Sequence, residues 1–184
     1  MSGYPDINLI ITAYLILLVM ESSGRVYLST ISKTPVLLLG PYSPEGDYEI
    51  LKQLLECLRE NGAESTKLCE ELGDSFDMES ISRKCLSWAE IVIVLFTNTA
   101  TRGGTTVEAT LLFREYPKKI ENTLFLTELG DNDIPAMSEI FLEEAEKRNL
   151  KLKMYKWERG REELLDVLCE TSFNFIQERV MSFL

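Results

Sequence analysis

The chain contains no histidine, and that absence removes several kinds of chemistry at once. Without an imidazole there is no histidine general base, no Ser-His or Cys-His nucleophile pair, and none of the commonest zinc sites. The four cysteines, Cys57, Cys69, Cys85 and Cys169, show no CxxC and no metal-type spacing. We therefore expect no metal and no cofactor. The thiols are expected to be free and buried in a cytoplasmic protein, and disulfides are expected only if the source is a hyperthermophile. Acid or base work would fall to carboxyl groups.

A basic segment is also lacking. The chain has 19 Lys plus Arg against 30 Asp plus Glu, which gives a formal net charge of −11. A field of that sign repels polyanions and argues against nucleic acid as a partner. With 184 residues, 45% of them hydrophobic, the chain can bury one full core.

Long hydrophobic runs are confined to residues 7–20, which carry no charge. The run is short for a membrane span, which needs about 20 residues, and no Lys or Arg precedes it as in a secretory signal. Three interpretations stay open: a buried or partner-covered element, a membrane attachment, or residues upstream of a true start at Met20. Burial is favoured over a membrane, and residues 1–33 are assigned to this apolar N-terminal segment with an edge strand at 25–29.

Short β-branched runs alternate with stretches of helical period over residues 34–184. Strands are expected at 34–40, 65–69, 90–96, 123–128 and 151–157, and helices at 45–61, 78–88, 105–115, 137–149 and 161–183. This alternation predicts right-handed βαβ units. The expected fold is a single α/β domain, a flavodoxin- or Rossmann-like three-layer sandwich with a mainly parallel five-stranded sheet in the order 2-1-3-4-5.

In that order the loops after the first and third strands face each other at the carboxyl ends of the sheet, where such folds bind ligands. Loop one, GPYSPEGD at 40–47, and loop two, TNTATRGGTTVE at 97–108, are therefore predicted to be neighbours. Turn formation and helix starts alone also account for many of these residue types. The candidate ligand-binding residues are Gly40, Pro41, Tyr42, Ser43, Asp47, Thr97, Asn98, Arg102, Gly103, Gly104 and Thr105.

Glu108 is the candidate catalytic residue, and two interpretations compete for it. Thr105 and Glu108 have the spacing of a capping box, in which each side chain satisfies a backbone N–H of the other residue. A capping box leaves Gly103 and Gly104 unexplained, since paired glycines let a chain approach a ligand closely. The helix dipole is expected to keep the carboxylate ionised, which suits a nucleophile or a stabiliser of a cation.

The segments VLLLGPYSPEGDYEILKQLLECLRENG and EIVIVLFTNTATRGGTTVEATLLF together resemble the nucleoside 2-deoxyribosyltransferase-like group. The resemblance covers about residues 34–128 and implies that Glu108 attacks the anomeric carbon of a sugar while Gly40, Pro41, Tyr42 and Asp47 hold a nucleoside. The family usually continues ELGxA after its glutamate, where this chain has EATLLF. Cytokinin-activating phosphoribohydrolases and Toll/interleukin-1 receptor-type domains are more weakly similar, and they too act on N-glycosidic bonds.

The function expected from the resemblance is binding of a nucleoside or nucleotide, with cleavage or exchange of its N-glycosidic bond by Glu108. Tyr42 would stack on a ring, and Arg102 with the amides of Gly103 and Gly104 would hold hydroxyl or phosphate oxygens. The family also implies a homo-oligomer whose sites are completed by a neighbouring subunit. The alternative is a non-catalytic nucleotide-sensing or protein-interaction module on the same fold, so enzymatic activity is left open.

Overall fold

The computed structural model describes residues 23–42, 47–73, 77–98, 104–129, 139–160 and 163–184. Five parallel strands form one sheet in the order β2-β1-β3-β4-β5, which confirms the predicted order. The strands are β1 (Val36–Leu39), β2 (Thr66–Leu68), β3 (Ile91–Phe96), β4 (Thr123–Glu128) and β5 (Lys153–Trp157). The α/β class and the parallel sheet are as expected.

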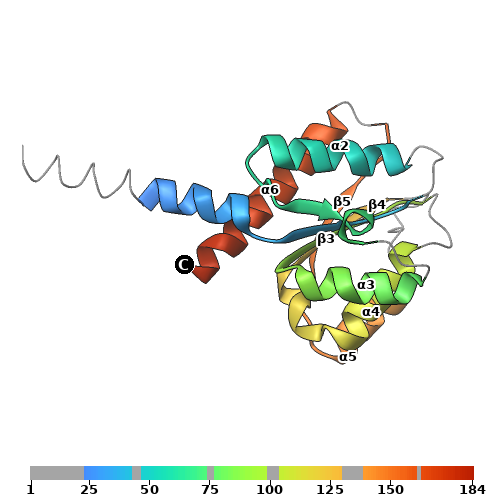
Figure 1. Ribbon diagram of the computed structural model, residues 1–184. Helices are drawn as coiled ribbons and strands as arrows, with labels where there is room; N and C mark the ends of the chain where they lie inside the picture. The colour runs from blue at the N-terminus through green and yellow to red at the C-terminus, as the bar shows by residue number, and fades with distance from the viewer. Residues whose placement is uncertain (1–22, 43–46, 74–76, 99–103, 130–138, 161–162) are drawn as a thin grey trace, which may run out of the picture.

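Helices cover both faces of the sheet, so the domain has three layers (Figure 1). The α2 and α6 helices lie on one face, and α3, α4 and α5 lie on the other (Figure 1). Their bounds are α2 (Asp47–Glu60), α3 (Met78–Trp88), α4 (Gly104–Glu115), α5 (Glu139–Lys147) and α6 (Leu164–Phe183), with two short 3-10 helices, η1 (Cys69–Leu72) and η2 (Pro117–Asn122). Each of the five long helices falls on a segment predicted to be helical.

Alternation along the central strands divides the buried side chains between two cores. In β3, Ile91, Ile93 and Leu95 belong to the core under α2 and α6, whereas the residues between them belong to the core under α3, α4 and α5. Because both faces are covered, every residue of β1 and β3 is buried, as a continuous apolar run predicts.

The predicted edge strand at 25–29 is wrong, because a helix spans residues 23–33. Helical spacing buries Ile31, which is 1% exposed, and packs Tyr27 one turn earlier against the same core. The hydroxyl of Thr30 donates to the Val26 carbonyl oxygen at 2.8 Å, a contact that only a helical turn provides. The run RVYLS is too short for its periodicity to separate helix from strand. No helix in the described part of the chain is long and apolar enough to cross a membrane.

The prediction of free thiols is also wrong, because the four cysteines form two disulfides. Cys57 on α2 is joined to Cys169 on α6, and Cys69 on η1 is joined to Cys85 on α3. Each pair joins elements that pack side by side on one face of the sheet, a proximity that residue spacing does not reveal. Disulfides persist in oxidising compartments and in intracellular proteins of hyperthermophiles.

Candidate functional site

The carboxyl ends of the parallel strands bring the two predicted loops together. Asp47 begins α2 after loop one, Thr97 follows β3, and the Thr97 hydroxyl donates to Asp47 Oδ2 at 2.7 Å. Both side chains are buried, with exposed fractions of 2% and 4%. Of the other candidates, Ser43, Arg102 and Gly103 lie outside the described residues.

Asp47 is also bound by a residue that the sequence did not single out. Arg159, just after β5, donates to Asp47 Oδ1 at 2.7 Å and to Glu128 Oε1 at 2.6 Å. Glu128, the last residue of β4, also accepts the backbone N–H of Asn98 at 2.7 Å. The hydrogen bonds to Glu128 and then to Asp47 hold the pKa of Arg159 above its ordinary value.

The members of this cluster bind one another, and their contacts connect the ends of β3, β4 and β5 to the start of α2. The carboxylates of Asp47 and Glu128 are almost fully buried and are bound by one guanidinium, so their oxygens are occupied by protein donors. The one available sequence signal is the position of Glu128 at a strand end, where parallel strands converge. Nothing in the sequence pairs it with Arg159.

Gly40 and Pro41 are buried at the end of β1. A Cβ on Gly40 would lie 2.6 Å from Leu51 Cδ1 and 3.3 Å from Leu95 Cβ, so the absence of a side chain lets the strand end pack against α2 and β3. Gly40 therefore has a packing reason that needs no ligand. Tyr42, one residue beyond Pro41, is half-buried and lines a cavity.

That cavity measures about 200 Å³, and Glu108 of α4 forms part of its wall. The remaining lining residues are Tyr42, Cys69, Glu70, Ile81 and Ser82. Glu108 is 1% exposed, and its Oε2 has no hydrogen-bond partner among the described residues. A buried, unpaired carboxyl oxygen is energetically unfavourable, and a hydrogen bond from a ligand would offset that cost.

The capping box predicted for Thr105 and Glu108 is wrong. The α4 helix begins at Gly104, so Thr105 lies inside the first turn rather than before it. The Thr105 hydroxyl is buried and, like Glu108 Oε2, has no hydrogen-bond partner in the part of the chain that the structure describes. Both polar groups therefore lack the reciprocal bonds that define a capping box.

The expected protonation state of Glu108 is wrong as well. Burial raises its pKa from 4.5 to about 8, so the carboxyl is mainly protonated at neutral pH. Desolvation by burial is the cause, and the described lining of the cavity contains no cationic side chain to oppose it. A neutral carboxyl can donate a proton, whereas it must lose that proton before it acts as a nucleophile.

Tyr42 contributes a neutral hydroxyl to the same cavity. Burial, and then the nearby charge of Glu108, raise the pKa of Tyr42 above its ordinary value. The Tyr42 hydroxyl oxygen accepts the backbone N–H of Cys69 at 3.4 Å, and its own O–H has no acceptor among the described residues. Glu70 supplies a second, exposed carboxyl that accepts a hydrogen bond from the Tyr48 hydroxyl.

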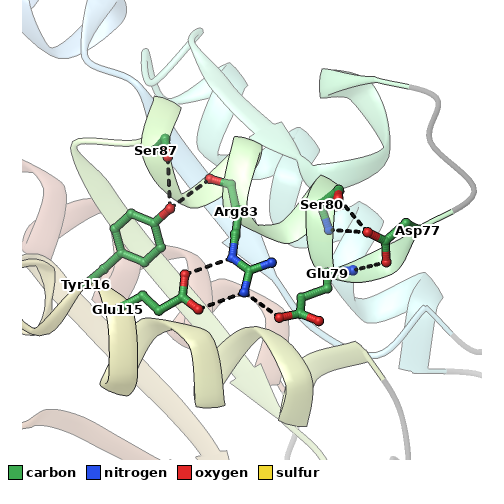
Figure 2. Close-up of polar contacts among 7 residues, drawn as sticks. All are labelled: Asp77, Glu79, Ser80, Arg83, Ser87, Glu115 and Tyr116. Atoms are coloured by element: carbon green, nitrogen blue, oxygen red, sulfur yellow. Dashed lines mark hydrogen bonds and ion pairs between the residues drawn. The ribbon is translucent and has the colours of Figure 1, made fainter.

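Two links fix the walls of the cavity. The Cys69–Cys85 disulfide ties η1 to α3, and Arg83 ties α3 to α4 through two hydrogen bonds of 2.8 Å to the carboxylate of Glu115 (Figure 2). Figure 2 shows the hydroxyl of Tyr116, the residue just after α4, beside Ser87 of α3, at 3.0 Å from its hydroxyl. The helices that carry Ile81, Ser82 and Glu108 are thus held at a fixed separation.

Neither a protein-family model nor a curated protein matches this chain. Among solved structures, the chain is similar to a diflavin flavoprotein A3 from Nostoc sp., with a TM-score of 0.51 and 14% sequence identity over 80% of this chain and 94% of that one. In the described residues, no group of three or more metal-ligating side chains is arranged to hold a metal ion. At this sequence identity the likeness extends to the fold alone, and the chain has a flavodoxin-like α/β fold.

Proposed function

We propose that this protein binds a nucleoside or nucleotide in the cavity beside Glu108 and cleaves or exchanges its N-glycosidic bond. The observation that carries the proposal is the buried carboxyl of Glu108, whose Oε2 is unpaired among the described residues and which shares a cavity with Tyr42. Buried titratable groups with strongly raised pKa values are typical of catalytic sites. The resemblance to the deoxyribosyltransferase-like group selects the same two residues.

The reaction can be written with the groups that line the cavity. Glu108 forms a bond to the anomeric carbon while the bond between that carbon and the base nitrogen breaks. The electron pair of the broken bond stays on the base, which takes up the proton that Glu108 loses. Water, or a second base in an exchange reaction, then displaces the sugar and restores the Glu108 carboxyl. The transition state resembles an oxocarbenium ion, which the carboxylate stabilises.

Tyr42 and Glu70 have supporting roles in this proposal. The free O–H of Tyr42 can donate to a sugar hydroxyl or to Glu108 as negative charge develops on it. Glu70 is exposed at the same cavity and can accept a proton from the attacking water. The Asp47 cluster lies at the strand ends and fixes the start of α2.

The competing function is a non-catalytic module that senses a nucleotide or contacts another protein. In that case a ligand would bind without chemistry, and Glu108 would only donate a hydrogen bond. Flavin is a further ligand to compare, because the structural neighbour is a flavoprotein. Two carboxylates at the strand ends, Asp47 and Glu128, do not favour a flavin phosphate there.

The experiment measures free base by chromatography after the protein is incubated with nucleosides and nucleotides. Wild type is expected to release base, and Glu108→Gln and Glu108→Ala are expected to release none while remaining folded. Glu146→Gln, which changes an exposed glutamate on α5, is the matched control and should retain full release. If neither wild type nor control releases base from any substrate, catalysis is refuted. A thermal shift with the same ligands and with flavin mononucleotide then identifies a binding module.

A further inference from the structure

The ionisable side chains with a carboxyl group in the described lining of the Glu108 cavity have no cationic counterpart there. Its described lining contains two carboxyl groups, Glu70 and Glu108, and no lysine or arginine. Lys84 of α3 is not part of the described lining, and its Nζ lies 2.6 Å from where a Cβ on Gly73 would be. Among the described lining residues, a phosphate would meet the carboxylate of Glu70 and no cationic partner.

The cavity also has the walls of a cation site. Tyr42 contributes an aromatic ring, and such rings attract cations that lie within about 6 Å of their centroid. Ile81 and Cys69, which is held in a disulfide, add apolar surface to the cavity, and Ser82 adds one hydroxyl. An aromatic ring combined with carboxylates in an apolar enclosure is the usual arrangement for binding an organic cation.

The size of the cavity limits what can enter it. A water molecule occupies about 30 Å³ of liquid, so a cavity of about 200 Å³ holds about seven non-hydrogen atoms. One six-membered ring with a methyl substituent fills that space. A single ring of the ligand, rather than a whole dinucleotide, is the part that lies against Glu108.

We infer that this cavity accepts a positively charged ring, so that the N-glycoside cleaved by this protein carries a cationic base and no phosphate close to the scissile bond. The inference rests on the proposed function and names its substrate class. It also removes the need for Glu108 to protonate the leaving base. When a cationic base leaves, it takes the electron pair of the glycosidic bond and becomes neutral, so it needs no proton from an acid. Water supplies the hydroxyl of the free sugar and releases one proton.

Binding of a cation should then depend on pH through Glu108. The titratable groups that face it are Tyr42 from the loop after β1 and Glu70 from η1, while the lining residues from α3 are uncharged. Because burial raises the pKa of Glu108 to about 8, the carboxyl must release a proton as the cation binds. The affinity should therefore rise about tenfold from pH 6 to pH 7 and level off above about pH 8.

The test uses three small ligands of nearly equal size and different charge. N-methylpyridinium is the cation, toluene is the neutral ligand of the same shape, and benzoate is the anion, each titrated by NMR at pH 6, 7, 8 and 9. We expect N-methylpyridinium to bind most tightly, with the stated pH dependence in wild type and none in Glu108→Gln. Equal or tighter binding of toluene or benzoate, a flat pH profile in wild type, or no binding of N-methylpyridinium would overturn the inference.

A second measurement separates this inference from the proposed function. Base release is compared at pH 6 for 7-methylguanosine and guanosine, which differ by one methyl group and a positive charge, and for guanosine 5′-monophosphate. Faster release from 7-methylguanosine supports both proposals. Release from guanosine or its monophosphate at an equal or higher rate keeps the proposed function and refutes the cationic substrate. Selective binding of N-methylpyridinium without any base release supports a cation-binding cavity and refutes the proposed cleavage.

Discussion

Glu108 should make the stability of this protein fall as pH rises, which is the reverse of the behaviour of a carboxylate held in a salt bridge. Below pH 4.5 the group is protonated in both the folded and the unfolded chain. Between pH 4.5 and about 8 the folded chain keeps a proton that the unfolded chain has lost. Unfolding therefore releases a proton, and the free energy of unfolding decreases as pH rises until it levels off above the folded pKa.

The magnitude follows from the size of the pKa shift. Each pH unit between the two pKa values contributes about 1.4 kcal/mol, so about 4 kcal/mol is lost between pH 5 and pH 9. Glu108 is 1% exposed, so solvent screening does not reduce this figure much. For a domain of this length the loss corresponds to roughly 8 to 16 °C in Tm.

The assay is chemical or thermal denaturation at pH 5, 6, 7, 8 and 9 with the disulfides kept oxidised. Glu108→Gln has the shape of the protonated residue and cannot ionise, so the difference in stability between wild type and this variant isolates Glu108 from every other titrating group. From pH 5 to pH 9, the free energy of unfolding of the variant should rise relative to that of wild type by about 4 kcal/mol. Glu146→Gln, exposed on α5, should show no such change. A constant difference between wild type and Glu108→Gln from pH 5 to pH 9 would refute the assignment of Glu108 as a buried acid.

Two further predictions concern the links that hold the fold together. Arg159→Met leaves two buried carboxylates without their cation and should lower the free energy of unfolding by about 2 to 3 kcal/mol. The loss is smaller than for a fully buried pair because the Arg159 side chain is 44% exposed. A loss below about 0.5 kcal/mol in urea denaturation would contradict a stabilising role of Arg159. Replacing both Cys57 and Cys169 by serine opens a loop of 112 residues, whereas replacing Cys69 and Cys85 opens one of 16. The first double replacement should lower the free energy of unfolding by about 5 kcal/mol, and the second by about 3 kcal/mol. The reverse order in calorimetry would show that loop length does not determine the loss.

The sheet was predictable because its signal is local. Strands β1 and β3 are buried on both faces, so each is a continuous apolar run that length and flanking residues identify as a strand. Alternation of such runs with helical periods then leaves few topologies, and the observed order is the one that right-handed crossovers favour. The helix over residues 23–33 was missed because VYL at 26–28 fits either period and only Ile31 decides between them.

The site was less predictable because its chemistry depends on contacts across the fold. Sequence placed Glu108 near loop one, but its burial depends on η1 and α3, which contribute Cys69, Ile81 and Ser82 to the cavity wall. Burial, rather than the helix terminus, decides the protonation of Glu108. Arg159 could not be paired with Glu128 in advance, because no pattern in the chain links a residue after β5 with one at the end of β4.

The most direct test of the role of Glu108 is a single-turnover measurement of base release with the protein in excess over substrate. Run at pH 7 on the nucleoside that gives the largest thermal shift, it compares wild type, Glu108→Gln and Glu146→Gln. Loss of one interaction made only in the transition state lowers the rate constant by about 100-fold or more. We therefore predict at least that loss in Glu108→Gln and none in Glu146→Gln. Equal rates for wild type and Glu108→Gln would show that Glu108 has no part in the chemistry.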